Sequence, residues 1–377
     1  MKITRIDTFK FWVDWCNWLF VRISTDEGLT GWGEGSLHGA IDAVEAAIGE
    51  YSPHLVGQDP AGPEHHWHRL YNAWRWRGGA VFSTALSALD IALWDLEGKR
   101  LGVPVARLLG GVFRTSLRGY ASHWLQGAQT PEDAFNGARE ASRRGFNAFK
   151  CRPFSHEGLL ANEAGEIRKA AALLEGAREG LGPDGEIFIE CSEFLSPRTA
   201  VLMDEALHPF RPGWFEEPIP FENAQAMVRL QRDIRTPIAT GERLLSRFEY
   251  RELLEHSGCR IVQPDLMHAG GFTECRKIAA MADMHYVPVA PHNPGGPICT
   301  AAAMHLAAAI PNFFILEQME PQRAFRDRAS SVPIRFEQGH FLLPEGPGLG
   351  IEPNLDALKE MNSRPQPRTE RSGSLYR

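Results

Sequence analysis

The segment WFEEPIPFENAQAMVRLQRDIRTPIATGER, residues 214–243, decides how this chain folds. It opens with a short apolar run that ends on Glu216, and it closes with a second short run that ends on Glu242. The stretch between them has the length of one helix with its two loops. The segment therefore predicts a strand, a helical crossover and a second strand, with an acidic side chain at the end of each strand.

The same arrangement repeats on both sides of this segment. The short apolar strands predicted there end on polar residues, and the steps between these residues are 26, 26, 23, 27 and 25. Strands that alternate with helices in this way form a parallel sheet. An open sheet would not bring six consecutive strand ends together, whereas a closed barrel does. The fold class is therefore α/β with a closed barrel, and its mouth carries Glu190, Glu216, Glu242, Asp265, His292 and Glu317.

Three of these residues are candidate metal ligands. The carboxylates of Glu190, Glu216 and Glu242 lie on successive strand ends, where they would repel one another unless a cation lay between them. Ligands that are all oxygen favour Mg²⁺, with Mn²⁺ as the alternative, over zinc. The competing interpretation is that each carboxylate forms a salt bridge at the barrel mouth.

Asp265 and His292 are the candidate acid–base pair. They end two consecutive strands, so a closed barrel places them within contact distance. A carboxylate on one ring nitrogen fixes the tautomer and raises the basicity of the other, which leaves that nitrogen free as a general base. We expect the other histidines, including His268 and His285, to be structural.

Two cations and two further polar residues complete the candidate site. Lys150 and Arg152 in FKCRP are two residues apart, which puts both side chains on the interior face of a strand. Arg152 can hold an anion but cannot act as a base, and both cations could instead balance the carboxylates. Glu317 faces the same mouth and is a candidate for a hydrogen bond to substrate. Arg77, in WRWR, stays open as a substrate-binding residue.

The composition excludes several classes of protein. Hydrophobic residues make up 43% of the 377 residues and charged residues 23%, as in ordinary globular proteins, and the net charge of −7 argues against a nucleic-acid partner. The first residues lack a signal-type apolar run, and the apolar stretch 301–310 is too short to cross a membrane. The six scattered cysteines form no CxxC pair, which suits reduced thiols in the cytoplasm. We therefore expect a cytoplasmic protein without a membrane partner.

The first hundred residues have a different pattern. Strands are predicted for residues 3–11 and 18–24, followed by the turn-rich stretch TDEGLTGWGEG. From Ser83 a helical pattern continues to Gly102. Farther along, Thr130 is predicted to cap a helix that begins at Pro131 and stops near Gly145.

Several motifs, in this order and spacing, resemble one family. FKCR, WFEEP, ATGER, QPDLMHAGG, APHNPGGP and ILEQ are similar to the mandelate racemase and muconate lactonizing branch of the enolase superfamily. Within it, TGERLLSRFEY and APHNPGGPI look most like the acid-sugar dehydratases, galactonate dehydratase among them. The resemblance implies an α+β capping domain over residues 1–116 and a modified (β/α)₇β barrel, a TIM-barrel variant, over 117–325. Residues 326–377 would return to the capping domain, with a polar tail from Asn362 that is mobile or an arm on a neighbouring subunit.

The resemblance also implies a reaction. Mg²⁺ on Glu190, Glu216 and Glu242 and the base His292 would remove the proton α to a carboxylate, and loss of the β-hydroxyl would give a 2-keto-3-deoxy sugar acid. The partner would be a small sugar acid, bound by a homo-oligomeric enzyme. The alternatives are an epimerase or racemase, a cycloisomerase, and a non-catalytic relative that keeps the metal.

Two departures from the family bear on these alternatives. Ser192, a candidate substrate-binding residue, stands where galactonate dehydratase-like relatives carry a second histidine that protonates the leaving hydroxyl. Arg152 stands where racemases carry a second lysine. We therefore expect His292 to act as the only base and to return the proton to the leaving group itself.

Overall fold

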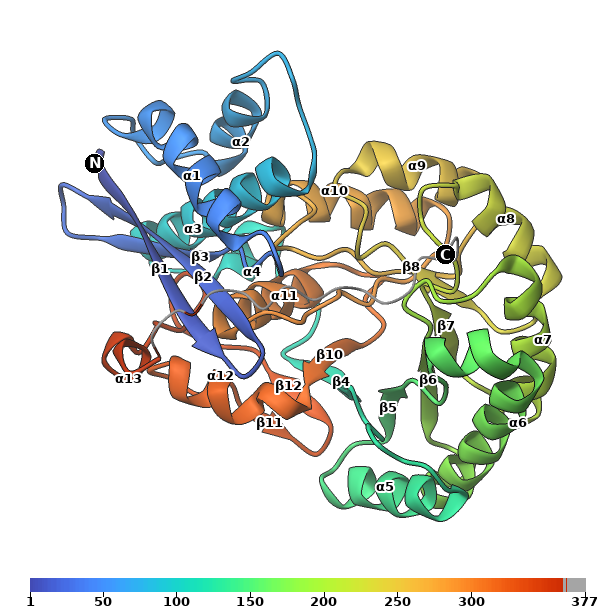
Figure 1. The fold of residues 1–377 in the computed structure, drawn as a ribbon. Coiled ribbons are helices and arrows are strands. Elements are labelled where there is room, and N and C mark those ends of the chain that lie inside the picture. The colour runs from blue at the N-terminus through green and yellow to red at the C-terminus, as the bar shows by residue number, and fades with distance from the viewer. Residues whose placement is uncertain (362–363, 365–377) are drawn as a thin grey trace.

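A computed structural model describes residues 1–361 and residue 364 of the chain. It contains an antiparallel sheet with helices at the N-terminal side and a barrel of parallel strands surrounded by helices (Figure 1). The α/β barrel fold class predicted from the strand-end spacing is thereby confirmed. The tail predicted from Asn362 onward lies, apart from Arg364, outside the described residues.

The N-terminal sheet contains β1 (Ile3–Val13), β2 (Cys16–Thr25) and β3 (Thr30–Glu34), paired antiparallel in that order. Both predicted strands are present, and both extend further toward the hairpin because only Asp14 and Trp15 form its turn. The glycines of GWGEG allow β3 to approach a helix closely. A Cβ atom at Gly33 would lie 1.9 Å from the carbonyl oxygen of Ala88, so only glycine fits there.

The helix that β3 approaches links the two parts of the molecule. This helix, α3, is buried on nearly all sides because it packs against the sheet on one side and against barrel helix α10 on the other. The helices of this part are α1 (Ile41–Leu55), α2 (Pro63–Tyr71), α3 (Ala80–Leu101) and α4 (Val105–Leu108).

The barrel strands pair parallel in chain order, and the last strand pairs with the first. Isolated bridges of Val289 to Val262 and to Phe313 close the gap between β9 and β10. The strands are β4 (Ser116–Ser122), β5 (Ala148–Cys151), β6 (Glu186–Glu190), β7 (Trp214–Glu216), β8 (Ile238–Thr240), β9 (Ile261–Val262) and β10 (Leu316–Met319).

Helices connect these strands on the outside of the barrel (Figure 1). Thr130 caps the first of them as predicted, since its side chain accepts a hydrogen bond from the backbone N–H of Asp133. The helices are α5 (Pro131–Arg143), α6 (His156–Leu181), α7 (Pro197–Leu207), η1 (His208–Phe210), α8 (Ala224–Asp233), α9 (Arg247–Glu255), α10 (Gly271–Met284) and α11 (Pro297–Ala309).

The barrel interior is layered, and this layering positions the site. A lower layer is apolar and consists of Tyr120, Ala148, Phe188, Trp214, Ala239, Ile261, Ala290 and Ile315. Side chains alternate along a strand, so the residues two positions further on face the same interior. These are Lys150, Glu190 and Glu216 on β5, β6 and β7, and Glu317 on β10 follows Ile315 in the same way. An ionic layer therefore lies directly above the apolar layer, at the carboxyl ends of the strands.

After β10 the chain returns toward the first sheet (Figure 1). The Trp12 backbone N–H donates to the Met361 carbonyl, and the Asn17 amide donates to the Arg364 carbonyl. The boundaries predicted at residues 116 and 325 stay predictions. The elements of this return are η2 (Glu320–Gln322), α12 (Arg323–Ala329), β11 (Phe336–Glu337), β12 (His340–Leu342), which pairs with β4, and α13 (Leu355–Lys359).

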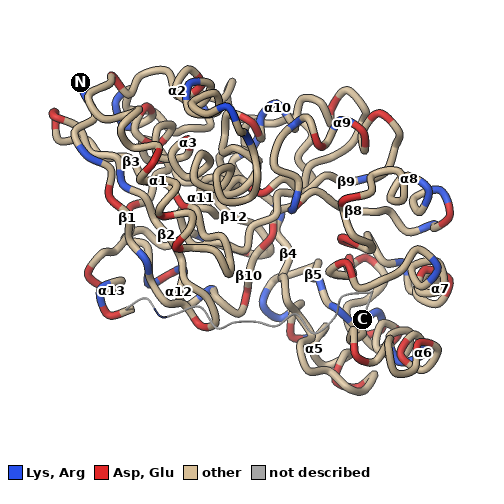
Figure 2. The backbone as a smooth tube through the Cα atoms, turned by 45° about the horizontal axis from the view of Figure 1, so that its top comes forward, with Lys and Arg blue, Asp and Glu red and all other residues tan. Residues whose placement is uncertain are grey.

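Charged residues of both signs occur on the outer helices α6, α7 and α8 (Figure 2). Among the helices that the structure describes, none has the length and apolar character needed to cross a membrane.

Candidate active site

A cavity of about 540 Å³ opens at the carboxyl ends of the barrel strands. Six of the ten predicted site residues line it: Lys150, Arg152, Glu190, Ser192, Glu242 and His292. Three more are buried in contact with these six: Glu216, Asp265 and Glu317. The barrel thus brings nine of the ten residues together, as the strand-end pattern predicts.

Lys150 lies at the centre of the ionic layer. Its ammonium is 3.1 Å from Glu190 and 3.2 Å from Glu317, and it also hydrogen-bonds Glu216. Burial alone would lower the pKa of Lys150, but Glu216, Glu317 and Glu190 raise it well above its usual value. The side chain therefore stays charged in this metal-free arrangement.

Fixed donors orient the carboxylates around Lys150. Glu216 accepts hydrogen bonds from the Trp214 indole at 3.0 Å and from the Gln263 amide at 2.8 Å. Although burial acts to raise the pKa of Glu190, the charge of Lys150 dominates and lowers it to about 2. Glu190 is therefore an anion at neutral pH, as a metal ligand has to be.

Glu242 contacts different partners from the other two predicted ligands. Its Oε2 lies 3.4 Å from the His292 Nε2 atom, and its Oε1 lies 3.2 Å from the Arg243 guanidinium. In the described part of the chain, no three ligand-type side chains are close enough together to hold a metal ion. The three oxygen donors on neighbouring strand ends fit Mg²⁺ in their chemistry. In this arrangement, however, the Lys150 ammonium takes the place of a cation between Glu190 and Glu216.

Asp265 and His292 form the predicted contact. The His292 Nδ1 atom lies 2.8 Å from Asp265, and the Met267 backbone N–H holds the other Asp265 oxygen at 2.7 Å. Burial lowers the pKa of His292, but Glu242, Asp265 and Glu317 outweigh this effect and raise it to about 10. With Nδ1 committed to Asp265, Nε2 is the atom directed at the cavity.

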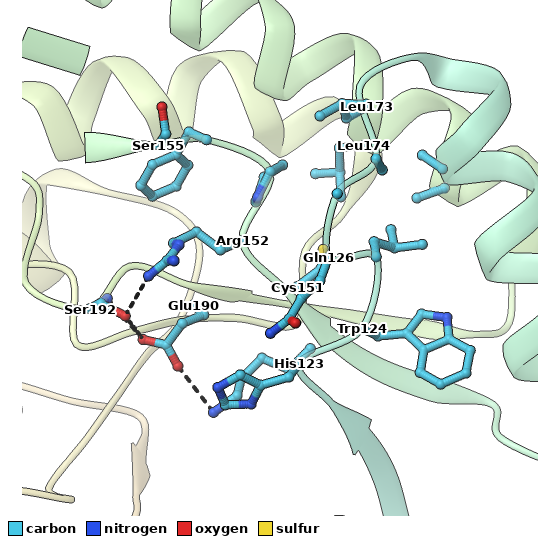
Figure 3. Close-up of a pocket in the computed structure, with 18 of the residues that line it drawn as sticks. His123, Trp124, Gln126, Cys151, Arg152, Ser155, Leu173, Leu174, Glu190 and Ser192 are labelled. Atoms are coloured by element: carbon cyan, nitrogen blue, oxygen red, sulfur yellow. Dashed lines mark hydrogen bonds and ion pairs between the residues drawn. The ribbon is translucent and has the colours of Figure 1, made fainter. Parts of the chain in front are cut away.

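Arg152 and Ser192 form a second hydrogen-bonded group at the cavity wall (Figure 3). The Arg152 guanidinium donates to the Ser192 hydroxyl at 3.3 Å, and that hydroxyl donates to Glu190 at 2.9 Å. The guanidinium also lies over the Phe194 ring, 5.1 Å from its centroid. Arg152 is in no ion pair with the described residues, so its charge remains available to a substrate anion.

Arg77 lies apart from the other nine residues. It is exposed after α2, where its guanidinium packs over the Tyr71 ring at 5.6 Å, and it does not line the cavity. Its predicted role in substrate binding therefore has no support from this position. The sequence pattern around it, WRWR, indicated only an aromatic and cationic cluster, which is also typical of surface packing.

Three residues that line the cavity were missed or given a packing role. His123 follows β4, and His38 and Trp15 come from the N-terminal part, with their two rings 4.5 Å apart. His123 has a similar place to the other site residues, since it directly follows barrel strand β4 and precedes Lys150 by 27 residues. His38 carries no such signal, because its place depends on how the N-terminal part packs on the barrel.

Two family models match the chain. The model described as "Mandelate racemase / muconate lactonizing enzyme, N-terminal domain" matches residues 13–110, and the model described as "Enolase C-terminal domain-like" matches residues 134–357. Together they span most of the chain.

Curated proteins and solved structures are similar over nearly the whole length. A D-galactonate dehydratase from Pectobacterium atrosepticum is 37% identical, and the alignment covers 96% of this chain and 94% of that protein. A D-galactonate dehydratase from Ralstonia pickettii is 38% identical, and the alignment covers 93% of this chain and 92% of that protein. A solved structure from Salmonella enterica, provisionally named a dehydratase, has a TM-score of 0.91 at 35% identity and covers 96% of this chain and 99% of that one. An enolase from Agrobacterium radiobacter, provisionally assigned as a galactarate dehydratase and bound to sodium and L-malate, has a TM-score of 0.89 at 32% identity and covers 96% and 95%.

Proposed function

The chain belongs to the mandelate racemase and muconate lactonizing branch of the enolase superfamily, and from this premise we propose that it is an acid-sugar dehydratase, a hydro-lyase. One observation carries the proposal: a histidine–aspartate pair and a ring of carboxylates meet a buried cation in a single cavity at the barrel mouth. These are the parts needed to remove a proton next to a carboxylate.

The proposed substrate is a sugar acid with a hydrogen on C2 and a hydroxyl on C3. D-galactonate is the first candidate because the curated relatives act on it. Galactarate, a dicarboxylic acid named for a structural relative, is the second candidate. A cavity of about 540 Å³ accommodates either six-carbon acid.

Each residue has a proposed role in this reaction. Glu190, Glu216 and Glu242 would hold Mg²⁺, or Mn²⁺, once Lys150 moves from between them. Bound Mg²⁺ would offset the charge of these carboxylates and of the substrate carboxylate, which favours loss of the C2 proton and a neutral His292. Lys150 and Arg152 bind the substrate anion.

The remaining roles concern proton transfer. His292, oriented by Asp265, removes the C2 proton with its Nε2 atom. Glu317 is an anion that already binds Lys150 and the Asn293 backbone N–H at 2.8 Å, so it accepts a hydrogen bond from a substrate hydroxyl.

The alternatives from the family have less support. An epimerase needs a second base across the substrate. Arg152 cannot accept a proton, and Lys150 stays charged as long as it pairs with the carboxylates. A non-catalytic relative would not need a histidine oriented by a buried carboxylate. A cycloisomerase stays a rival of the same superfamily, since it uses the same first step. The predictions of a cytoplasmic location and of a homo-oligomer stay predictions.

The proposed function is tested by screening the purified full-length protein with Mg²⁺ against a panel of acid sugars that includes D-galactonate and galactarate. We expect one or a few of them to give a 2-keto acid, and we expect His292→Asn to abolish this product. An epimer at C2 without any 2-keto acid would reassign the protein to the epimerases.

A further inference from the structure

Two histidines in the cavity have no role in the function proposed above. His38 follows β3 and His123 follows β4, and both line the cavity that contains His292. The proposed reaction also lacks a dedicated donor of a proton to the departing hydroxyl, because Ser192 stands where related dehydratases carry a second histidine.

His123 begins a hydrogen-bonded chain that ends on a buried carboxylate. Its Nδ1 atom lies 3.0 Å from the Ser122 hydroxyl, and interaction with that hydroxyl is among the causes that lower the pKa of Glu317. Burial acts to raise the pKa of Glu317, but Lys150 and His292 lower it well below its usual value, so Glu317 is an anion. Ser122 therefore donates to the carboxylate and accepts from Nδ1–H of His123. This arrangement leaves Nε2 as the free nitrogen of the ring.

The free nitrogen of His123 is available to the cavity. The backbone of His123 has a φ of 55°, in the left-handed region that few residues other than glycine adopt. This conformation turns the chain out of β4 at the barrel mouth, and Figure 3 shows the ring among the side chains that line the cavity. Although part of its side chain reaches solvent, the ring lies among the cavity residues, and its Nε2 atom has no hydrogen-bond partner among residues 1–361 and 364.

His123 and His292 lie on either side of Glu317. β10 pairs with β4, so that Met319 lies opposite Ser122. On the other side, the backbone N–H of Asn293, next to His292, donates to Glu317. Two histidines placed in this way around one carboxylate can transfer protons at two neighbouring carbon atoms of a bound substrate.

Other groups in the cavity are poor proton donors. Burial lowers the pKa of His38 to about 4, so its ring is neutral at neutral pH. The Ser192 hydroxyl already donates to Glu190, and Arg152 does not release a proton. Burial and then Lys150 also lower the pKa of His123, whereas Glu317 and Glu190 act to raise it. His123 differs from His38 in that two carboxylates, Glu317 and Glu190, act on it and favour the charged ring, whose Nε2–H can be donated.

We infer that His123 is the catalytic acid that protonates the leaving hydroxyl, an inference that rests on the proposed dehydratase function. The C2–H bond breaks and its proton goes to Nε2 of His292. The electron pair is first held by the substrate carboxylate as an ene-diolate, which can take the proton back at C2. It then forms the C2–C3 double bond as the C3–O bond breaks, and the oxygen takes the Nε2 proton of His123 and leaves as water. The enol then takes up a proton at C3 and loses its hydroxyl proton to give the 2-keto-3-deoxy acid. Solvent reprotonates His123, and His292 gives up its proton.

The test uses the full-length His123→Asn variant with Mg²⁺ and the acid sugar that the wild-type protein dehydrates. We expect 2-keto acid formation to fall by about 10²- to 10⁴-fold, the range for removal of a general acid. Exchange of the C2 hydrogen in D₂O, followed by NMR, should continue because His292 is intact. The 3-deoxy-3-fluoro derivative of the same sugar acid should release fluoride at nearly the wild-type rate, because fluoride leaves without a proton.

His285→Asn, at the exposed end of α10, is the matched control and should leave all three rates unchanged. If His123→Asn forms 2-keto acid at the wild-type rate, the inference is wrong and the proposed function stands. If the variant also loses exchange and fluoride release, His123 is not the leaving-group acid. If the wild-type protein dehydrates no acid sugar of the panel, the proposed function fails and the inference fails with it.

Discussion

Lys150 occupies the point at which three carboxylates converge. Glu190, Glu216 and Glu317 all contact its ammonium, and these contacts make it the counter-ion of the ionic layer. The role of Lys150 therefore differs between the metal-free and metal-loaded protein, because Mg²⁺ would compete with it for Glu190 and Glu216.

We expect Lys150→Met to lower the melting temperature of the metal-free protein. Removing one partner of a buried ion pair costs about 3–5 kcal/mol, because the remaining charges stay unpaired. Mg²⁺ should raise the melting temperature of the variant by more than that of the wild type, since the lysine no longer competes. Thermal unfolding with and without Mg²⁺ measures both effects. Lys169→Met is the control, because among the residues that the structure describes the Lys169 ammonium hydrogen-bonds only the amide oxygen of Gln129. Equal Mg²⁺ shifts in Lys150→Met and the wild type would contradict the competition.

His305 should make stability depend on pH. Its Nδ1 accepts from the Ala106 backbone N–H and its Nε2 donates to the Leu349 carbonyl, so the folded state binds the neutral ring. Burial lowers its pKa to about 4 from 6.5. As pH falls, the unfolded state therefore takes up the proton first. The contribution of the neutral His305 ring to the free energy of unfolding is lost as pH falls from 6.5 toward 4.

Urea unfolding of the wild type and of His305→Gln at pH 7 and pH 5 tests this sign. We expect the stability difference in favour of the wild type to shrink by about 2 kcal/mol at the lower pH, from 1.36 kcal/mol for each pKa unit. A difference that is independent of pH, or larger at pH 5, would show that His305 is not held neutral.

At the scale of elements, β3 fixes the N-terminus of α11. The Glu34 carboxylate accepts hydrogen bonds from the backbone N–H groups of Gly296 at 2.6 Å and Cys299 at 2.9 Å, and from the Ser36 hydroxyl at 2.8 Å. The site loop that follows His292 leads directly into this helix. A carboxylate from the N-terminal sheet thus holds a loop of the barrel mouth.

Glu34→Gln should destabilise the protein by about 1–3 kcal/mol. The amide has one oxygen for two backbone donors, and its NH₂ group would face a buried N–H, which leaves polar groups unsatisfied. Differential scanning calorimetry checks this expectation, with Glu255→Gln at the exposed end of α9 as the matched control. An unchanged melting temperature in Glu34→Gln would show that the contact with α11 contributes little.

The elements also show what the sequence can and cannot predict. Glu216, Asp265 and His292 were found because strand-end residues recur at a regular spacing, and a closed barrel converts that spacing into proximity. The competition of Lys150 for the carboxylates could not be predicted, since it depends on side-chain conformations. His123 shares the spacing but precedes the segment from which the pattern was traced. The position of His38 in the cavity depends on how the N-terminal part docks on the barrel, and a local sequence pattern does not encode this docking.

At the scale of the whole molecule, buried polar contacts join the N-terminal part to the barrel. Asp90 on α3 accepts from the Thr273 backbone and hydroxyl on α10, and the Trp67 indole donates to the Gly270 carbonyl at 2.9 Å. Glu34 adds the contact with α11 described above. Separation of the two parts would break these hydrogen bonds and expose the buried faces of α3 and α10, so their unfolding should be coupled.

This coupling predicts that a ligand of the barrel protects the N-terminal sheet. Mg²⁺ should bind only barrel residues. Its binding nevertheless raises the free energy of opening of every region that opens together with those residues, by about 2.7 kcal/mol at a hundredfold excess over Kd. Hydrogen-exchange mass spectrometry on the full-length protein should therefore show slower exchange on addition of Mg²⁺ in β2 as well as in β6. The Glu242→Gln variant is the control, because a weakened site should give little added protection in either strand. If Mg²⁺ slows exchange in β6 of the wild type while β2 is unchanged, the two parts open independently and the contacts of Asp90, Trp67 and Glu34 do not couple them.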